Sequence, residues 1–290
     1  MSNVVKIVEC PRDAWQSLPG VMPPEVKADY LRVLIAAGFK HIDAVSFVAK
    51  EAVPQMADSE RVLEYLDPPD DVEIIALAVN ADGAKRAVKS GAIQTLAFPY
   101  SLSPAWLKAN QDQTPEESLE ALEEIGTLAY QAGMEVSAQM TMAFGNGFDE
   151  PWSIEEVVDA CDLLADCGVQ QITLVDSLGQ ATPRLVHDVL ADVLAVHDRI
   201  EIGVHLHARP EDAAAKIAAA YKAGCRRFDA AIAGMGGCPA AKDVLVTNIA
   251  TEGLIAALKA LGAELPEMRP LDGLVAANAE MQRKYGVRLQ

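Results

Sequence analysis

Eight short runs rich in β-branched residues alternate with longer amphipathic helical patterns, and this alternation constrains the fold more than any other feature of the chain. Such alternation is typical of parallel strands joined by crossover helices. Eight units without a linker rich in Pro, Gly or Ser favour one closed α/β barrel, the (β/α)8 or TIM barrel, over two open sheets. We place the eight strands at residues 4–10, 41–47, 72–79, 95–100, 135–141, 171–176, 201–207 and 227–233.

Glycines mark the ends of several predicted helices, because glycine adopts a left-handed conformation without a Cβ clash. These glycines are Gly38, Gly91, Gly133, Gly168 and Gly224. The pattern assigns residues 1–262 to the barrel and residues 263–290 to a C-terminal helical extension. We expect a helix at 271–285 that covers one barrel end or meets a partner chain, such as the second copy in a homodimer.

The composition excludes several classes of protein. With 51% apolar and 23% charged residues the chain is expected to fold into a globular domain. Lys plus Arg is 24 and Asp plus Glu is 42, so the net charge of −18 disfavours binding to nucleic acid or anionic lipid. The first residues lack the pattern of a signal peptide, and no apolar run reaches the roughly 18 residues of a membrane span. We therefore expect a cytoplasmic protein without a membrane partner.

Polar side chains gather at the predicted carboxyl ends of the strands, where the reacting groups of such barrels stand. Arg12 and Asp13 follow the first strand directly after Pro11. The other strand ends carry Asp43, Ser46, Asp176, His205 and His207. The sequence therefore predicts a site at this end of the barrel.

The segment His205-Leu206-His207 is the sharpest local signal. Alternate residues of a strand project to one face, so the two imidazoles can converge on one ion. Taken alone, such a pair more often serves packing or hydrogen bonding. Asp13 adds a carboxylate from a nearby strand, and this set suits a divalent ion such as Mg²⁺, Mn²⁺, Co²⁺ or Zn²⁺ without choosing among them.

Cys238 lies in the glycine-rich segment Ala233-Gly234-Met235-Gly236-Gly237-Cys238-Pro239 after the last strand. One interpretation is a mobile loop that brings a thiol over the barrel mouth, and the other is a tight turn with a bystander thiol. The segment lacks the fingerprints of nucleotide-binding loops. Asn248, ten residues further on, is expected to begin the next helix, where its simplest role is that of an N-cap.

The remaining cysteines give little indication of chemistry. The chain has five cysteines without a CxxC pair, which indicates reduced thiols rather than a disulfide framework. Burial explains Cys161, Cys167 and Cys225. Cys10 precedes the Pro-Arg-Asp turn and is expected near the site.

Several motifs together resemble the DRE-TIM metallolyases, and among them the hydroxymethylglutaryl-CoA lyase family. The resemblance covers nearly the whole chain. The matching segments are residues 5–9 (VKIVE), 11–13 (PRD), 46–48 (SFV), 53–56 (VPQM), 205–207 (HLH), 233–239 (AGMGGCP) and 248–252 (NIATE).

The resemblance implies roles for single positions. Asp13, His205, His207 and Asn248 match the family's metal ligands, and Arg12 matches an arginine that faces the thioester oxygen. Cys238 matches a catalytic cysteine on a mobile loop, Asp176 a site aspartate, and Asp43 the place of a glutamate. The implied reaction is retro-Claisen cleavage of 3-hydroxy-3-methylglutaryl-CoA, an acyl-CoA substrate, into acetyl-CoA and acetoacetate, with Mg²⁺ or Mn²⁺ favoured.

The chemistry asks for these residue types independently. A divalent cation bound to the tertiary hydroxyl eases loss of its proton, and His205 with Asp176 or Asp43 nearby is the expected acceptor. Arg12 would stabilise the enolate oxygen of the departing thioester. Cys238 would protonate the enolate carbon from a closing loop.

Departures from the family pattern predict an altered substrate pocket. Ala14, Trp15 and Gln16 follow Asp13 where the family commonly has Gly-Leu-Gln, and Ala208 replaces an aspartate after the two histidines. Asp43 is one methylene shorter than the usual glutamate, and residues 144–148 read FGNGF without the usual Cys-Pro. The residues expected to contact substrate are Gln16, Trp15, Ser46, Gly236 and Gly237.

Two other functions fit the same sequence. A condensing enzyme or aldolase of the superfamily would use the same chemistry in another direction, although the Gly-Gly-Cys-Pro turn at Cys238 favours the lyase branch. A non-catalytic barrel that serves as a binding or scaffold subunit is the third alternative, because Ala14 and Ala208 suggest drift around the site.

Overall fold

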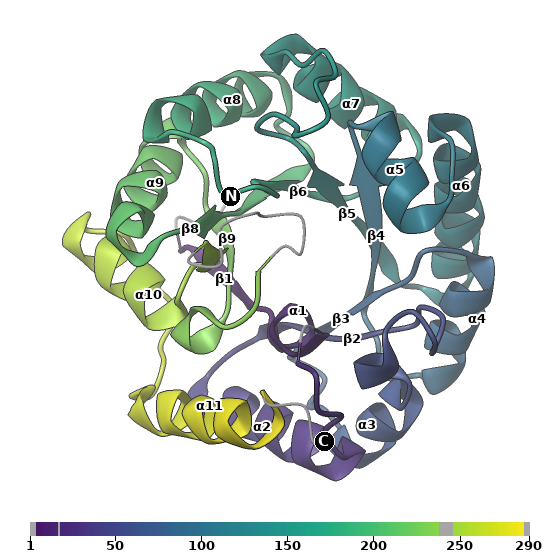
Figure 1. Cartoon of the computed structure of the whole chain (residues 1–290), viewed down its shortest axis with the longest axis vertical. Helices are drawn as coiled ribbons and strands as arrows, with labels where there is room; N and C mark the ends of the chain where they lie inside the picture. The colour runs from purple at the N-terminus through teal and green to yellow at the C-terminus, as the bar shows by residue number, and fades with distance from the viewer. Residues whose placement is uncertain (1–3, 17, 238–245, 287–290) are drawn as a thin grey trace.

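The computed structural model describes residues 4–16, 18–237 and 246–286, and it confirms the predicted barrel. Eight parallel strands close into a ring in the order β1-β2-β3-β4-β5-β6-β7-β9, with the helices outside it (Figure 1). The barrel strands are β1 Lys6–Glu9, β2 His41–Ser46, β3 Glu73–Leu77, β4 Thr95–Ser101, β5 Glu135–Thr141, β6 Gln171–Val175, β7 Glu201–His205 and β9 Arg227–Ala230.

The helices bury their apolar stripes against the outside of this ring. None of those in the described part of the chain is long and apolar enough to cross a membrane. The helices are α1 Pro11–Gln16, α2 Pro24–Ala37, α3 Ser59–Leu66, α4 Ala81–Ser90, α5 Pro104–Gln111, α6 Pro115–Ala132, α7 Ile154–Asp166, α8 Pro183–Val196, α9 Pro210–Ala223, α10 Thr251–Ala260 and α11 Asp272–Tyr285, with short 3₁₀ helices η1 Pro54–Met56 and η2 Ile232–Gly234.

Local caps begin and end the helices, and the predicted glycine ends are confirmed. The side chain of Thr114 accepts a hydrogen bond from the amide of Glu117, and the Glu117 carboxylate accepts one from the amide of Thr114, so α6 begins with a capping box. Gly38 ends α2 with a φ of 107°, a left-handed conformation that favours glycine. These local signals fix where each helix returns the chain to the barrel.

Helix α11 packs against the barrel rather than standing apart from it. It lies beside α2 in Figure 1, and its residues Leu274, Met281 and Tyr285 belong to the main apolar core. Asn278 donates a hydrogen bond from Nδ2 to the carbonyl oxygen of Ile232 in η2, over 2.5 Å. The helix expected at 271–285 is therefore confirmed, while the domain boundary near residue 262 stays a prediction.

The structure corrects two strand assignments and one cap. The seventh strand does not continue to His207, because β7 ends at His205 and His207 begins a separate strand, β8 (His207–Ala208). Strand β8 pairs antiparallel with β10 (Thr247–Asn248), so Asn248 is opposite His207. Asn248 is therefore not the N-cap residue of α10, a position that Ala250 occupies. The last barrel strand ends at Ala230 rather than at residue 233, because the chain turns into η2.

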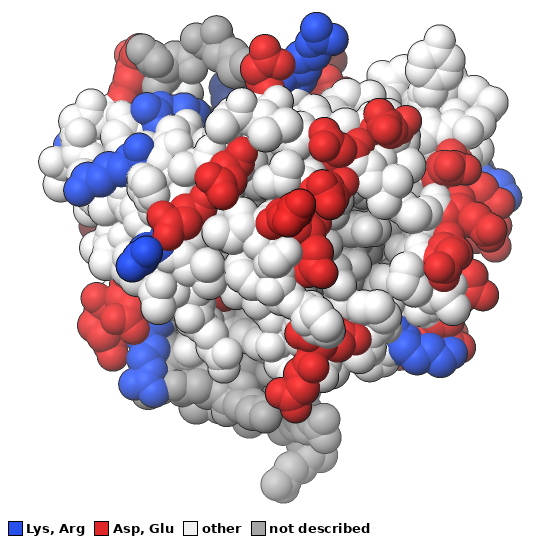
Figure 2. Space-filling model, turned by 90° about the horizontal axis from the view of Figure 1, so that it is seen from above, with Lys and Arg blue, Asp and Glu red and all other residues white. Residues whose placement is uncertain are grey.

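The surface agrees with the acidic composition. Figure 2 shows the side of the molecule that lies at the top of Figure 1, and red acidic side chains clearly outnumber blue basic ones there. Helix α7 on this side carries Glu155, Glu156, Asp159, Asp162 and Asp166. Such a surface repels polyanions, as the net charge of −18 already indicates.

Candidate active site

A short helix holds the first two residues of the candidate site. Strand β1 ends at Glu9, and Pro11 starts helix α1, whose first turn carries Arg12 and Asp13 at the carboxyl end of the barrel. Pro11 suits a helix start because its ring fixes φ and its missing N–H has no partner to lose there. The helix therefore presents a guanidinium and a carboxylate side by side, with 3.5 Å between Nη1 of Arg12 and Oδ1 of Asp13.

Arg12 is buried and ion-paired. Its Nε donates to Oδ1 of Asp43 at 3.1 Å and its Nη2 to Oδ2 of the same carboxylate, a two-pronged arrangement that fits the planar guanidinium. Gln16 on α1 and Gln139 on β5 accept further hydrogen bonds from it. Burial opposes the charge, but Asp43 and Asp13 outweigh it and raise the pKa of Arg12. Arg12 is thus a fixed cation within the barrel mouth.

Asp13, His205 and His207 converge at one point, as the sequence predicted. One ligand atom of each lies within 4.8 Å of the others. The Nδ2 group of Asn248 donates to Oδ2 of Asp13 at 2.7 Å, and its Oδ1 lies 3.0 Å from Nε2 of His205. The β8–β10 pairing, which the sequence did not indicate, brings Asn248 to this cluster.

The donor set of this cluster fits a divalent cation. Nε2 of His207 is buried without a hydrogen-bond partner among the described residues, while its Nδ1 is held 2.9 Å from the carbonyl oxygen of Asp176. Burial and the neighbouring His205 lower the pKa of His207 to about 4, so its imidazole is neutral near pH 7. Burial alone would raise the pKa of Asp13. The charges of Arg12 and His205 outweigh the effect of burial, so the pKa of Asp13 is lowered overall. A neutral imidazole with a free nitrogen beside an ionised carboxylate is what a metal ion requires.

Gly236 allows the chain to approach this cluster closely. Its φ is +86°, and a Cβ at this position would lie 2.8 Å from Cα of Ala14 and 3.0 Å from Nδ2 of Asn248. Any side chain here would therefore press on α1 and on Asn248 together. Gly237 also has a positive φ, of 149°, and a Cβ at this position would lie 3.1 Å from the carbonyl oxygen of Val246.

Lys216 on α9 is a site residue that the sequence analysis missed. Its buried Nζ donates to Oδ2 of Asp176 at 2.8 Å, to the carbonyl oxygen of His207 at 2.8 Å and to that of Gly179 at 2.9 Å. It therefore joins the ends of β6 and β8. A lysine in an alanine-rich helical pattern is ordinarily exposed, so only its position on the inner face of α9 reveals this role.

Asp229 on β9 is the second residue that was missed. Its Oδ2 lies 3.6 Å from Nδ1 of His205, the place where Asp176 or Asp43 was expected. Those two carboxylates are held instead by Lys216 and Arg12. Cys10, expected near the site, is buried close to His205 and Asp229, and burial raises the pKa of its thiol well above its ordinary value.

The residues expected to contact substrate lie in different surroundings. Gln16 donates from Nε2 to Oδ1 of Asp13 at 2.8 Å, so it belongs to the cluster. Trp15 has no exposed surface and packs edge-on against Tyr30 of α2, with ring centroids 5.6 Å apart, so it is a core residue in this structure. Ser46 ends β2, and its buried hydroxyl has no partner among the described residues. Cys238 lies outside the described residues.

Comparison with known sequences points to one family. A family model described as HMGL-like matches residues 5–281. The chain is 33% identical over 261 residues to a cytoplasmic 3-hydroxy-3-methylglutaryl-CoA lyase of Danio rerio, covering 90% of this chain and 77% of the relative. It is also 33% identical over 259 residues to a mitochondrial hydroxymethylglutaryl-CoA lyase of Bos taurus, covering 89% of this chain and 79% of the relative.

Solved structures agree with these relatives. The HMG-CoA lyase of Bacillus subtilis superposes with a TM-score of 0.90 at 28% identity, covering 99% of this chain and 96% of that one. An HMG-CoA lyase of Acinetobacter baumannii in complex with coenzyme A and 3-methylmalate gives a TM-score of 0.88 at 29% identity, covering 100% and 95%. The resemblance drawn from the motifs is confirmed.

Proposed function

The chain belongs to the HMGL-like family, and we propose that it is a carbon–carbon lyase that cleaves 3-hydroxy-3-methylglutaryl-CoA or a closely related thioester into acetyl-CoA and a keto acid. With the first substrate the keto acid is acetoacetate. The tertiary hydroxyl loses its proton, the bond between carbons 2 and 3 breaks, and the electron pair passes to the acetyl thioester as an enolate. A proton then adds to the enolate carbon.

One observation carries this proposal: a buried arginine stands next to a metal-type cluster at the carboxyl end of the barrel. The reaction creates negative charge at two places, on the hydroxyl oxygen and then on the thioester oxygen. Two adjacent cationic positions match these two places. The printed names of the relatives and the coenzyme A bound to the Acinetobacter enzyme support an acyl-CoA substrate.

Arg12 is assigned to the enolate oxygen. Its guanidinium is already fixed by Asp43 and Gln139, so it needs no reorganisation when charge develops. Gln16 contacts both Arg12 and Asp13 and so fixes the position of the guanidinium relative to the carboxylate. In this proposal Asp43 positions Arg12 and does not itself take part in proton transfer.

His205 is assigned as the acceptor of the hydroxyl proton. Burial alone would lower the pKa of the His205 imidazole. Asp229 and Asp13 outweigh burial, so the pKa is raised overall and His205 binds a proton more readily than a free imidazole does. Asp176 is less suited because Lys216 already pairs with its carboxylate. A neutral imidazole whose lone pair binds a metal ion cannot accept a proton, so His205 can act as the base only while Asp13, His207 and Asn248 hold the ion without it.

In the protein without substrate, Asp13, His205, His207 and Asn248 would hold a divalent cation, for which Mg²⁺ or Mn²⁺ is our proposal. During proton transfer the other three residues would hold it without His205. When bound, such an ion lowers the pKa of a coordinated hydroxyl group and so eases loss of its proton near pH 7. The second cluster, Cys10 with His205 and Asp229, suits an ion less well, because its thiol donates to the carbonyl oxygen of Val8 and resists ionisation.

Cys238 is assigned as the acid that protonates the enolate carbon. It follows Gly237, the last described residue before the gap at 238–245, and Gly237 lies beside the cluster. A thiol suits this role because it releases a proton more readily than a hydroxyl group.

The test is a panel of 3-hydroxyacyl-CoA thioesters incubated with the purified protein and Mg²⁺ or Mn²⁺, with both products identified by mass. We expect 3-hydroxy-3-methylglutaryl-CoA or a relative with a different acyl substituent to yield acetyl-CoA and the matching keto acid. Ala208 and residues 144–148 depart from the family pattern. They predict that a related thioester with a different acyl substituent is cleaved at least as well as 3-hydroxy-3-methylglutaryl-CoA. Failure to cleave any member of the panel would overturn the proposal.

A further inference from the structure

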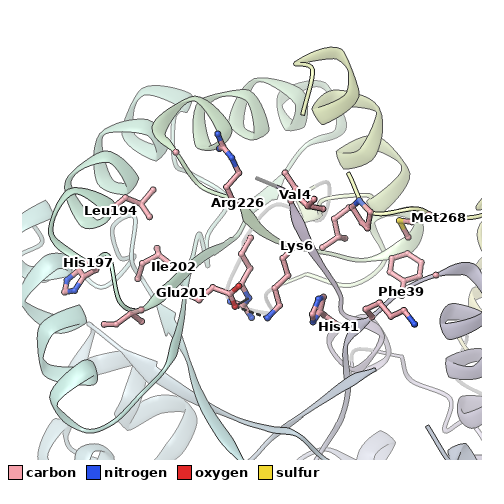
Figure 3. Close-up of a pocket in the computed structure, with 18 of the residues that line it drawn as sticks. Val4, Lys6, Phe39, His41, Leu194, His197, Glu201, Ile202, Arg226 and Met268 are labelled. Carbon is pink, nitrogen blue, oxygen red and sulfur yellow. Dashed lines mark hydrogen bonds and ion pairs between the residues drawn. The ribbon is translucent and has the colours of Figure 1, made fainter. Parts of the chain in front are cut away.

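A cavity of about 680 Å³ lies at the opposite end of the barrel from the candidate active site. It is lined by the first residues of four strands: Lys6 of β1, His41 of β2, Glu201 of β7 and Arg227 of β9. In Figure 3 Lys6 and Glu201 meet in the middle of the view, with Leu194 and His197 to one side and Phe39, His41 and Met268 to the other. The volume is that of an ordinary small-molecule site.

The charge around this cavity contrasts with the rest of the chain. Five of the 24 Lys and Arg residues line it, but only one of the 42 acidic residues does. The lining cations are Lys6, Lys40, Arg199, Arg226 and Arg227, and the acid is Glu201. The lining residues thus carry more positive than negative charge, in contrast to the net charge of −18 of the whole chain.

Not all of this positive charge is neutralised by carboxylates. Lys6 pairs with Glu73 and Glu201 at 3.1 and 2.9 Å, and Lys40 pairs with Asp71. Arg227 lies 3.6 Å from Glu201 and 3.8 Å from Asp229. Arg199 is different, because it is exposed and makes no hydrogen bond or ion pair within the described ranges.

Arg226 also lacks a carboxylate partner in the described part of the chain. Its Nη1 donates to the carbonyl oxygens of Tyr221 and Cys225, and its guanidinium lies 4.1 Å from the ring centroid of Tyr221. Arg199 and Arg226 precede β7 and β9, which are adjacent strands of the barrel. Both unneutralised cations therefore lie just before adjacent strands that line the cavity.

Apolar side chains form the remaining walls. Phe39, Leu194, Ile200, Ile202 and Met268 line the cavity and leave part of it without hydrogen-bonding groups. An inorganic anion would leave these walls uncovered, whereas an anion with a hydrocarbon body would cover them.

We propose that this cavity binds a small organic anion that carries a carboxylate on an apolar body, with Arg199 facing the carboxylate. A guanidinium recognises a planar carboxylate through paired hydrogen bonds. The site is separate from the proposed lyase site, since the strands between them are four to seven residues long. The test of this binding site is therefore independent of the test of the proposed function.

The test uses hexanoate as the probe and the full-length protein labelled with ¹³C at its methionine methyl groups. Met268 lines the cavity, while the buried Met142 follows β5 at the other end of the barrel. Replacing each by leucine identifies its signal. We expect hexanoate to shift the Met268 signal with a dissociation constant of about 1 mM and to leave Met142 unchanged. Hexanamide, which has the same body without the charge, is expected to bind about tenfold more weakly or not at all.

Arg199→Glu removes the unpaired cation at an exposed position, so the variant is expected to fold and to bind hexanoate about tenfold more weakly. Arg184→Glu at the first turn of α8 is the matched control, because this arginine is also exposed and lies outside the cavity. Equal binding by Arg199→Glu and wild type would overturn the proposal. So would equal shifts from hexanoate, hexanamide and inorganic phosphate, or no shift of Met268 at about 20 mM hexanoate.

Discussion

Arg12 and Asp13 are neighbours in the sequence, yet apart from Gln16, which contacts both, their side chains have different partners. Arg12 is bound by Asp43 and Gln139, and Asp13 by Asn248 and Gln16. In the proposed function, one turn of α1 thus supplies the Arg12 cation for the enolate oxygen and the Asp13 carboxylate for a metal ion. At the residue scale, the proposed function rests on this division.

Arg12→Lys tests the first half of that division. Lysine keeps the charge but cannot donate in two parallel directions, so kcat is expected to fall by about 10²-fold while KM changes little. Steady-state kinetics would measure both constants, with Arg61→Lys on the exposed face of α3 as the control. Thermal unfolding of each variant separates lost chemistry from lost folding. An unchanged kcat in Arg12→Lys would remove Arg12 from the mechanism.

Cys238→Ser tests the proposed acid. Serine keeps nearly the same shape but raises the pKa of the donor by several units, so turnover is expected to fall by about 10² to 10⁴-fold while metal binding persists. The assay is run in deuterated water, and label is sought in the methyl group of the acetyl product. Normal turnover with normal labelling would show that another group delivers the proton.

At the scale of elements, strands β8 and β10 complete the candidate site. The two-residue strand β10 places Asn248 opposite His207, and Gly236 lets the preceding segment reach Ala14 without a clash. The sequence predicted Asn248 as a ligand only through the family resemblance, because a single antiparallel pair between distant segments leaves no periodic pattern. Its local sequence instead suggested a helix cap.

Glu9 couples β1 to α10 and η2. Its carboxyl group accepts hydrogen bonds from the amide of Ile232 at 2.8 Å and the hydroxyl of Thr251 at 2.6 Å, and burial raises its pKa to about 8. Between about pH 4.5 and 8 the folded protein therefore retains a proton that the unfolded chain releases. This group's contribution to stability is present below about pH 4.5 and is lost as the pH rises toward 8, by about 1.4 kcal/mol per unit.

Glu9→Gln is neutral at every pH and can keep both contacts. We expect its free energy of unfolding, relative to wild type, to rise by about 1.4 kcal/mol per pH unit between about pH 5.5 and 7.5. Urea unfolding at several pH values measures this difference, and Glu211→Gln on the exposed start of α9 is the control. A difference between Glu9→Gln and wild type that does not change with pH would contradict the assignment.

At the scale of the whole molecule, the barrel was predictable because its signals are local and repeated. Each strand–helix unit carries its own caps and apolar stripe, and eight units leave few ways to close the sheet. The clustering of polar residues at strand ends was predictable for the same reason, since the fold places those ends together. Asp13, His205 and His207 do lie together, and their role as metal ligands stays a prediction.

The residues that the sequence analysis missed are those whose role depends on packing between distant elements. Lys216 acts from the inner face of a helix, and Asp229 lies within a strand whose burial pattern does not show which side chains reach the site. The buried Arg227 side chain likewise lies beside Gly203. A Cβ at Gly203 would be 2.7 Å from Nη1 of Arg227. A charged side chain inside a barrel becomes visible only with its partners.

In the proposed function this end of the barrel cleaves a 3-hydroxyacyl-CoA thioester with the help of a divalent ion held by Asp13 and its neighbours. The most direct measurement incubates ¹³C-labelled 3-hydroxy-3-methylglutaryl-CoA with chelator-treated protein and then adds Mg²⁺ or Mn²⁺, while NMR follows both products. Wild type is expected to form acetyl-CoA and acetoacetate in equal amounts only after the metal is added, and Asp13→Asn about 10²-fold more slowly or not at all. Cleavage at full rate in excess chelator, or at wild-type rate by Asp13→Asn, would contradict the claim.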